Sequence, residues 1–523
     1  MRIGVDVGGT NTDAVLMDGR RVVATYKSPT TADVGSGIVA AIRAVLDASG
    51  LGPESIKAVM IGTTHFTNAF VERKRLLPVG IIRIALPAGK GLPPLMDWPE
   101  DLKAGVGGDV ALVGGGREFD GRPIAPLDEA AVAEAARRFR AKGLTAVAIS
   151  SIFAPVSPDM EERAAAIVRE QHPDALITLS GSIGRIGMLE RENATIMNAS
   201  LAEMARHVVA SFHAALAELK LDCPFFVSQN DGTLMNAETV ARFPVLTFAS
   251  GPTNSMRGAA YLSGLTDALV IDIGGTTSDV GMLVKGFPRE SSVAVDIGGV
   301  RTNFRMPDIL SIGLGGGSHV RPEQGPVDGS GEVSVRVGPD SVGYRLPQEA
   351  RVFGGEVLTT SDIAVAAGLA RMGDPSRVAG LDRRLVTAAQ AEIRRLLSGA
   401  IDRMKTSATD LPVVLVGGGA ILVDGTLPGA ARIVRPENGG VANAIGAAIA
   451  QIGGEVDRVY SYQELGREAA IAKAKEEAAA IAIRAGAAPG SIDIRDLEEV
   501  PLAYLPGGAV RIRAKAVGDM AGI

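Results

Sequence analysis

The sequence of 523 residues is short of several residue types, and each shortage excludes a class of protein. Its one cysteine, Cys223, excludes an intrachain disulfide and a multi-cysteine metal site. No apolar run approaches the roughly 18 residues of a membrane helix. Basic residues do not outnumber acidic ones, since the net charge is −6. This charge argues against nucleic acid or an acidic membrane as a partner. An apolar strand begins at Arg2 and leaves no room for a signal peptide, so we expect a cytoplasmic protein.

The sequence does contain a glycine turn that occurs twice. The first copy reads Asp6-Val7-Gly8-Gly9-Thr10-Asn11-Thr12-Asp13, and the second reads Asp272-Ile273-Gly274-Gly275-Thr276-Thr277-Ser278-Asp279. Asp, Gly, Gly, Thr, a polar pair and Asp recur in the same register. The repeat suggests two similar half-molecules that face each other across a nucleotide.

The flanks of each copy predict β-hairpins. The first copy lies between the apolar runs Ile3–Val7 and Ala14–Met17, and the second lies between Leu269–Ile273 and Val280–Val284. In a dinucleotide-binding fold the glycines would open a helix instead. A glycine hairpin exposes backbone N–H groups that can hold phosphate oxygens. The alternative is two tight hairpins in unrelated β segments, which the matched flanks make the weaker interpretation.

Polar side chains of the two turns can complete a phosphate site. The hydroxyls of Thr10, Thr12, Thr276 and Thr277 would add hydrogen-bond donors. Asp6 and Asp272 would repel a phosphate, so we expect them to hold a magnesium ion, through water.

A third glycine segment fits the same site. The apolar run Pro412–Val416 ends in Gly417, Gly418 and Gly419, a turn that could lie beneath a nucleobase. Beyond it, Asn438 and two glycines lead into a helical, small-residue segment. A plain loop followed by a packed helix is the alternative for either feature alone.

This order of motifs resembles the superfamily of actin, the heat-shock 70 chaperones and the sugar kinases. Within it, the chain resembles the hydantoinase A / 5-oxoprolinase family, which includes subunits of ATP-dependent lactamases and ketone carboxylases. The resemblance extends from residue 3 to about 320, with the triple glycine continuing it to about 450. The stretches that carry it are GVDVGGTNTDAVL from Gly4, IGTTHFTNAF from Ile61, RENATIMNASL from Arg191, SQNDGTLM from Ser228, ASGPTNSMRGA from Ala249, DIGGTTSDVG from Asp272 and SIGLGGGS from Ser311.

We therefore expect an α/β fold of two ribonuclease-H-like halves around a nucleotide cleft, of the actin and sugar-kinase type. The predicted divisions are an N-terminal half over 1–185, a second half over 186–455 with an inserted β loop at 315–350, and a small α+β appendage over 456–523. Residues 105–121 are glycine-rich and are interpreted as a connecting loop or hairpin. Residues 194–219 are interpreted as one long helical stretch.

The resemblance implies ATP and Mg²⁺ as cofactors, with the phosphates between the two hairpins. It also implies phosphorylation of a cyclic amide oxygen, as in a hydantoin, 5-oxoproline or a lactam, followed by ring opening by water. We expect a separately encoded partner subunit, a homo-oligomer, or both. The alternatives are a ketone carboxylase subunit, a small-molecule kinase and a reactivating chaperone ATPase.

Other side chains are weaker candidates. His65 and Asn68 could act on the substrate, His65 as an acid or base, although a structural histidine is the more common outcome. Asp13 and Asp279 could be bases or could brace the hairpins. Arg191, Asn193 and Asn198 are further candidates for the substrate, and His319 could touch phosphate or metal or could be a loop histidine that faces solvent.

Overall fold

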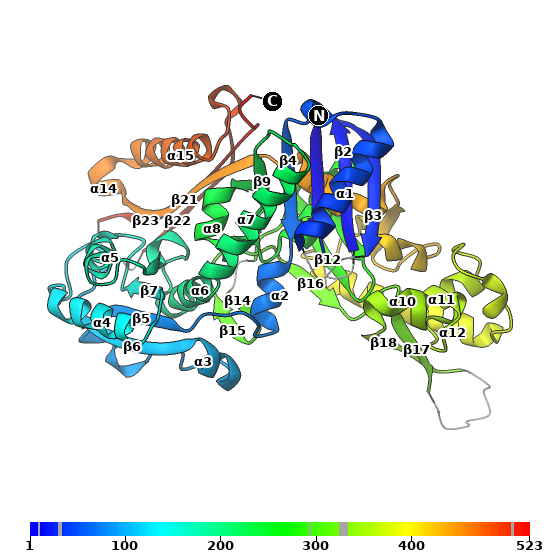
Figure 1. Cartoon of the computed structure of the whole chain (residues 1–523), viewed down its shortest axis with the longest axis horizontal. Helices are drawn as coiled ribbons and strands as arrows, with labels where there is room; N and C mark the ends of the chain where they lie inside the picture. The colour runs from blue at the N-terminus through cyan, green and yellow to red at the C-terminus, as the bar shows by residue number, and fades with distance from the viewer. Residues whose placement is uncertain (9–10, 30–33, 292–293, 324–332, 504–506, 523) are drawn as a thin grey trace.

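A computed structural model describes residues 1–8, 11–29, 34–291, 294–323, 333–503 and 507–522 (Figure 1). Among the helices formed by these residues, none combines the length and the apolar character that crossing a membrane requires.

The largest sheet has nine strands in the order β22-β23-β21-β10-β9-β4-β1-β2-β3. It begins with the meander that the sequence predicts, because the apolar runs on either side of the first glycine turn form the antiparallel pair β1 and β2. β4 then pairs with β1 in parallel. The strands are β1 Arg2–Val7, β2 Asn11–Asp18, β3 Arg21–Pro29, β4 Ala58–Thr63, β9 Phe225–Ser228, β10 Leu234–Asn236, β21 Ile452–Ser461, β22 Asp493–Pro501 and β23 Ala509–Gly518.

The second sheet repeats this arrangement around the second glycine turn. β11 pairs with β12 in antiparallel fashion and with β19 in parallel, as β1 does with β2 and β4. The two halves of the predicted repeat are therefore alike in strand pairing. The strands are β11 Ala268–Ile273, β12 Ser278–Val284, β13 Phe287–Pro288, β16 Ile309–Ile312, β19 Leu411–Val416 and β20 Ala430–Val434.

A third, four-stranded sheet has the order β6-β5-β7-β8 and lies to one side of the molecule (Figure 1). Its edge strand corrects our interpretation of residues 105–121 as a loop, because Gly107–Gly114 forms β6 beside β5. The glycines there concealed a strand in which Val113 is the one fully buried apolar residue. The strands are β5 Val79–Leu86, β6 Gly107–Gly114, β7 Ala146–Ser151 and β8 Leu176–Leu179.

The nine-stranded sheet crosses both of the boundaries that we predicted. β9 and β10 come from the predicted second half, and β22 and β23 come from the predicted appendage, yet all four continue the sheet that starts with β1. Helix α15, Arg467–Arg484, packs on this extension through Ala470, Ala474, Ala478 and Ala482, which are fully buried. The C-terminal segment is thus a continuation of the first sheet.

The remaining elements include two small hairpins and the helices that cover the sheets. The predicted β loop contains the hairpin of β17 and β18, while residues 324–332 lie outside the described residues. The predicted helical stretch over 194–219 is two helices, α6 and α7, which meet at Leu201. The bounds are α1 Val34–Ser49, α2 His65–Val71, α3 Glu100–Val106, α4 Glu129–Ala141, α5 Asp159–Gln171, α6 Met188–Ser200, α7 Ala202–Glu218, α8 Ala237–Arg242, α9 Ser250–Ser263, α10 Leu346–Glu349, α11 Thr360–Ala366, α12 Arg383–Met404, α13 Ala442–Ile449, α14 Tyr462–Leu465, β14 Val295–Ile297, β15 Val300–Thr302, β17 Ser318–Pro322 and β18 Val335–Ser341.

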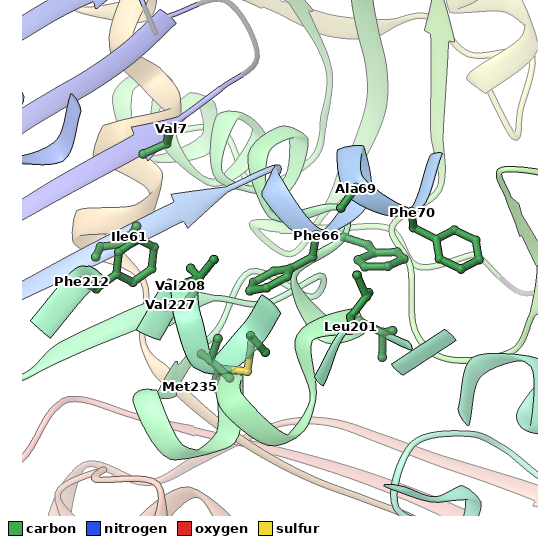
Figure 2. Close-up of a cluster of buried hydrophobic side chains, with 14 of the residues drawn as sticks. Val7, Ile61, Phe66, Ala69, Phe70, Leu201, Val208, Phe212, Val227 and Met235 are labelled. Carbon is green, nitrogen blue, oxygen red and sulfur yellow. The ribbon is translucent and has the colours of Figure 1, made fainter. Parts of the chain in front are cut away.

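The main apolar core lies between the first sheet and the helices on its face. Figure 2 shows its centre, where Phe66 and Phe70 of α2 lie near Leu201 and the strand residue Val227. These side chains are fully buried. Burying a side chain of this size contributes roughly 1.5–3 kcal/mol, so this cluster holds α2 firmly behind the first glycine turn.

Helices α9 and α13 cross between the two repeated sheets at unusually short distance. A Cβ atom at Gly258 would lie 1.9 Å from the carbonyl oxygen of Ala442, and one at Gly446 would lie 1.8 Å from that of Asn254. α13 packs on β1, β2 and β4, while α9 packs on β11, β12, β13 and β19 and also contacts β4. The two glycines therefore fix the distance between the two sheets.

We expect Gly446→Ala to destabilise the protein by about 1–3 kcal/mol, because the added methyl group has to push the crossing helices apart. Chemical denaturation measures this free energy of unfolding. The matched control is Gly399→Ala in α12, where a Cβ meets no atom within 4 Å. That variant should be neutral or more stable by up to about 1 kcal/mol. Equal effects of the two substitutions would contradict the tight crossing.

Candidate functional site

The two glycine turns form hairpins of the same geometry. The backbone N–H of Gly8 donates to the carbonyl of Asn11 at 3.0 Å, and that of Gly274 donates to the carbonyl of Thr277 at 2.9 Å. In the strand register Asp6 lies opposite Asp13, just as Asp272 lies opposite Asp279. Gly9 and Thr10 lie outside the described residues.

A cavity of about 410 Å³ lies between the two hairpins. Its size is within the ordinary range of ligand pockets, roughly 300–1,000 Å³. Many of the predicted site residues line it, together with the polar side chains of Lys27, Thr64, Ser255 and Asn443. The predicted residues that line it are Asp6, Gly8, Asn11, Asp272, Gly274, Gly275, Thr276, Thr277, Gly417, Gly418 and Gly419.

Close backbone approach explains why the second half of this cavity is built from glycine. At Gly417 the φ angle is +81°, and a Cβ there would lie 2.2 Å from Oδ1 of Asp272. A Cβ at Gly315 would lie 2.6 Å from the carbonyl carbon of Gly275. The next two residues, Gly316 and Gly317, donate backbone hydrogen bonds to the carbonyls of the second turn at 3.0 and 2.7 Å. Three glycine segments thus hold one another in place and leave no side chain in the way of a ligand.

Of the two predicted metal carboxylates, Asp6 is buried and only partly satisfied, while Asp272 is half-buried. Asp6 is 3% exposed; its Oδ2 accepts a hydrogen bond from Nδ2 of Asn443 at 2.9 Å, while its Oδ1 makes no well-formed hydrogen bond among the described residues, with the amide of Asn254 as its neighbour. Burial and the charge of Asp13 raise the pKa of Asp6 to about 7. Asp272 accepts a hydrogen bond from the hydroxyl of Ser255, and burial raises its pKa as well.

These features fit a nucleotide with a divalent cation. A cation-binding carboxylate that has no cation bound keeps an oxygen without a partner, and its pKa is raised because no positive charge offsets its burial. Among the described residues there is no group of three or more His, Cys, Asp or Glu side chains that could hold a metal. Asp6 and Asp272 would therefore hold Mg²⁺ with the help of water and phosphate oxygens, as this ion commonly requires.

Lys27 is a cation of this site that sequence reasoning missed. Its Nζ donates to Oδ1 and Oδ2 of Asp13 at 2.6 and 2.7 Å and to the carbonyl of Gly440 at 3.2 Å. Lys27 on β3 lies directly opposite Asp13 on β2. The sequence did hold a signal for this pair, because Asp13 and Lys27 carry opposite charges on the two strands that flank the Asp18-Gly19 turn. The corresponding acid of the second half, Asp279, instead accepts a hydrogen bond from Ser311, and burial raises the pKa of Asp279 to about 6.

Several predicted residues lie outside the cavity lining. Thr12 is buried in β2, and Asn438 precedes the lining residues Gly439 and Gly440. The Nδ1 of His65 lies 3.0 Å from Oγ1 of Thr63. Burial, followed by the charge of Arg75, lowers the pKa of His65.

Asn68 is a neighbour of the cavity, because its amide donates to the hydroxyl of the lining residue Thr64 at 3.4 Å. The remaining candidates serve the fold. Arg191 donates to the carbonyl of Ser151 at 2.6 Å, and Asn193 accepts from the indole of Trp98 at 2.8 Å. The other two contacts are Asn198 with the carbonyl of Arg242 at 2.8 Å and His319 with Arg321 at 2.9 Å.

Comparison with solved structures supports the two-lobed α/β fold. The ATP-dependent caprolactamase from Pseudomonas jessenii superposes with a TM-score of 0.76 at 20% identity, over 99% of this chain and 87% of that chain. A nucleotide-free acetone carboxylase gives a TM-score of 0.68 at 20% identity, over 99% of this chain and 88% of that chain. At this level of identity the likeness concerns the fold.

The chain belongs to the hydantoinase/oxoprolinase family. The family model for the N-terminal region matches residues 2–172, and the hydantoinase/oxoprolinase model matches residues 191–374. The alpha subunit of caprolactamase from Pseudomonas jessenii is 28% identical over 393 residues, which cover 70% of this chain and 54% of the relative. The gamma subunit of acetophenone carboxylase from Aromatoleum aromaticum is 28% identical over 401 residues, covering 70% and 53%. This chain spans about half the length of these relatives.

We expect Asp6→Asn to change how stability depends on pH. In the protein without ligands the folded-state pKa of about 7 exceeds the ordinary 3.8, so the unfolded chain releases this proton more readily. Stability is then lost as pH rises from about 4 to about 7, by at most about 1.4 kcal/mol per pH unit. The variant lacks this loss and should melt above the wild type at pH 8, with the difference shrinking at pH 4.

Thermal unfolding across this pH range measures the effect, and the exposed Asp18→Asn is the control. Magnesium with ATP should raise the melting temperature of the wild type more than that of Asp6→Asn. Parallel pH profiles for the wild type and Asp6→Asn would contradict the raised pKa.

Proposed function

We propose that this chain binds ATP with Mg²⁺ between its two hairpins and phosphorylates the carbonyl oxygen of a cyclic amide. A hydantoin, 5-oxoproline or a lactam is the substrate class. The observation that carries the proposal is the pair of matched hairpins, each with a carboxylate that lines one cavity, in a member of this family.

The chain's own groups suit phosphoryl transfer, in which positioning and electrostatics supply most of the catalysis. Backbone N–H groups of the two turns hold phosphate oxygens, and Gly417 to Gly419 lie against the base. Mg²⁺, when bound, supplies positive charge to the phosphates. Asn443 and Ser255 hold Asp6 and Asp272 in the orientation that this role requires. Lys27 adds the positive charge of a side chain at the edge of the cavity.

Phosphorylation solves a specific problem of amide chemistry. The nitrogen lone pair feeds the carbonyl group and makes it a poor electrophile. Attack of the amide oxygen on the γ-phosphorus forms an O–P bond and breaks the bond to the bridging oxygen, which leaves with ADP. Water can then add to the activated carbon, so that the ring opens and phosphate is released.

A partner protein completes this proposal. The relatives are named as subunits, and this chain spans about half of their length. We infer that the attack of water takes place with a separate subunit or with the part of the relatives that this chain does not match.

Carboxylation of a ketone is the second candidate. It is supported by the acetophenone carboxylase relative, whose 28% identity equals that of the caprolactamase relative. In that reaction an activated ketone and activated bicarbonate would replace the amide and water.

The first experiment measures ATP turnover in the presence of hydantoins, 5-oxoproline, lactams, and ketones with bicarbonate. The protein is purified from its native host together with the proteins that copurify with it. We expect one cyclic amide to stimulate release of ADP and phosphate with a ring-opened product. Stimulation by a ketone that depends on bicarbonate would favour the second candidate. ATP turnover that no compound stimulates would contradict both.

Asp272→Asn tests the cleft itself. We expect the rate of ATP turnover to fall by at least about a hundredfold, because the variant loses a charge that positions the cation and phosphates. The matched control is the exposed Asp424→Asn, which should be unchanged. Wild-type turnover and nucleotide affinity in Asp272→Asn would contradict the assignment.

A further inference from the structure

A second cavity, of about 590 Å³, lies on the side of the crossing helices α9 and α13 away from the hairpins. Its lining comes from the start of β1, the turn between β2 and β3, the last turns of α9, the end of α13, β22 and the segment after β23. Figure 1 shows the start of β1 and the C-terminal end of the chain at the same edge of the molecule. The cavity thus joins the first sheet, its C-terminal extension and the second repeated sheet.

Four arginines line this cavity, namely Arg2, Arg20, Arg257 and Arg495. Among the described lining residues the one acid is Asp519, which accepts a hydrogen bond from Gln451 at 3.0 Å. Arg495 also pairs with Asp493 at 3.1 Å, but both side chains are about half exposed, and such pairs are weak. Positive charge therefore exceeds negative charge around this cavity.

Arg257 is the half-buried member of the group that extends from helix α9. Its Nη1 donates to the carbonyl of Gly286 at 2.7 Å, and its guanidinium carbon lies 3.8 Å from the centre of the Phe287 ring. Its Nε is buried without a hydrogen-bond partner in the described part of the chain. Burial and then the charge of Arg495 lower the pKa of Arg257 to about 10, so this guanidinium stays charged at neutral pH. Asp231 offsets part of this cost, but Arg257 shares the cavity lining with three other arginines, and an anion bound there would lower the cost of holding these cations together.

The turns around the arginines leave room for such an anion. Gly19 and Gly264 have φ angles of +56° and +70°, and a Cβ at either would meet no atom within 4 Å. The hydroxyl of Tyr261 donates to the carbonyl of Arg20, and the guanidinium of Arg20 lies 5.4 Å from that ring. Arg20 is thus held at the rim of the cavity. Planar guanidinium groups suit carboxylate and phosphate oxygens in particular.

We propose that this cavity binds a small, multiply charged oxyanion, either a polycarboxylate or a phosphate ester, among its four arginines, and that its occupancy changes the affinity of the hairpin site for nucleotide.

The two crossing helices supply the physical connection between the sites. Ser255 of α9 bonds Asp272 at the hairpin site, while Arg257, two residues further along α9, lines the second cavity. Asn443 of α13 bonds Asp6, and Ile449 at the other end of α13 lines the second cavity. Because glycine contacts fix the crossing, a small shift of either helix at one end moves a carboxylate partner at the other. This second half of the proposal rests on the proposed nucleotide site.

Calorimetric titration tests the binding, with citrate as the polycarboxylate and fructose 1,6-bisphosphate as the phosphate ester. Ionic strength is held constant, since salt screens such contacts. The test variant is Arg20→Gln with Arg495→Gln, which leaves Arg257 in place. The control is Arg169→Gln with Arg206→Gln, two exposed arginines that do not line the cavity.

We expect at least one probe to bind the wild type and the control alike, and the test variant about tenfold more weakly or worse. The probe that binds more tightly shows whether the ligand is a polycarboxylate or a phosphate ester. Failure of both probes to bind the wild type would overturn the site, and so would equal affinity for the test variant. If an acidic peptide binds the wild type and neither small probe does, the proposal of a small-oxyanion site is also overturned.

The coupling is measured as the dissociation constant of ADP with and without the saturating probe, at fixed free Mg²⁺. We expect a change of about fivefold or more in the wild type and none in the test variant. An unchanged constant in the wild type would overturn the coupling. Absence of ADP binding would instead refute the proposed function, while the probe titration would still report on the arginine cavity.

Discussion

The structure depends on the close crossing of α9 and α13. Two glycines, Gly258 and Gly446, let one helix backbone lie against the other; α13 packs on the first hairpin sheet, and α9 packs mainly on the second. The distance between the two glycine turns is therefore set by backbone contact and not by adaptable side chains. The same helices supply Ser255 and Asn443, so the contact that joins the halves also orients the carboxylates between them.

Burial of Asp6 is the second constraint. An acid in an apolar interior is expensive to ionise, and Asp6 shows this in its raised pKa. A cation bound between the hairpins removes that cost, so ligand binding and stability of the site are linked. The family relatives act on amides and ketones by their names, and both substrates carry a carbonyl oxygen that a well-positioned phosphoryl group could reach.

The sequence alone predicts what depends on short stretches of chain. Both hairpins, the strand before Gly417 and the strands around the first turn follow from local apolar runs and glycines. Lys27, Ser255 and Asn443 are missed because distant segments bring them to the site, and only Lys27 leaves a signal in the strand register. The path of the first sheet through β9, β10 and β21 to β23 is missed for the same reason, since pairing between remote strands has no local pattern. β6 is missed because its glycines imitate a loop.

The two halves of the repeat resemble each other more in strand pairing than in the charges of their side chains. β3 lies beside β2 and β16 lies beside β12, so Lys27 and Ser311 occupy matching places opposite the second aspartate of each turn. One half thus presents an ammonium group and the other a hydroxyl. Two identical halves would receive an elongated ligand equally well in either direction. At these matching places the cavity is less negative on the side where Lys27 pairs with Asp13 than on the side of Asp279, so its two ends would not be equivalent for a charged ligand.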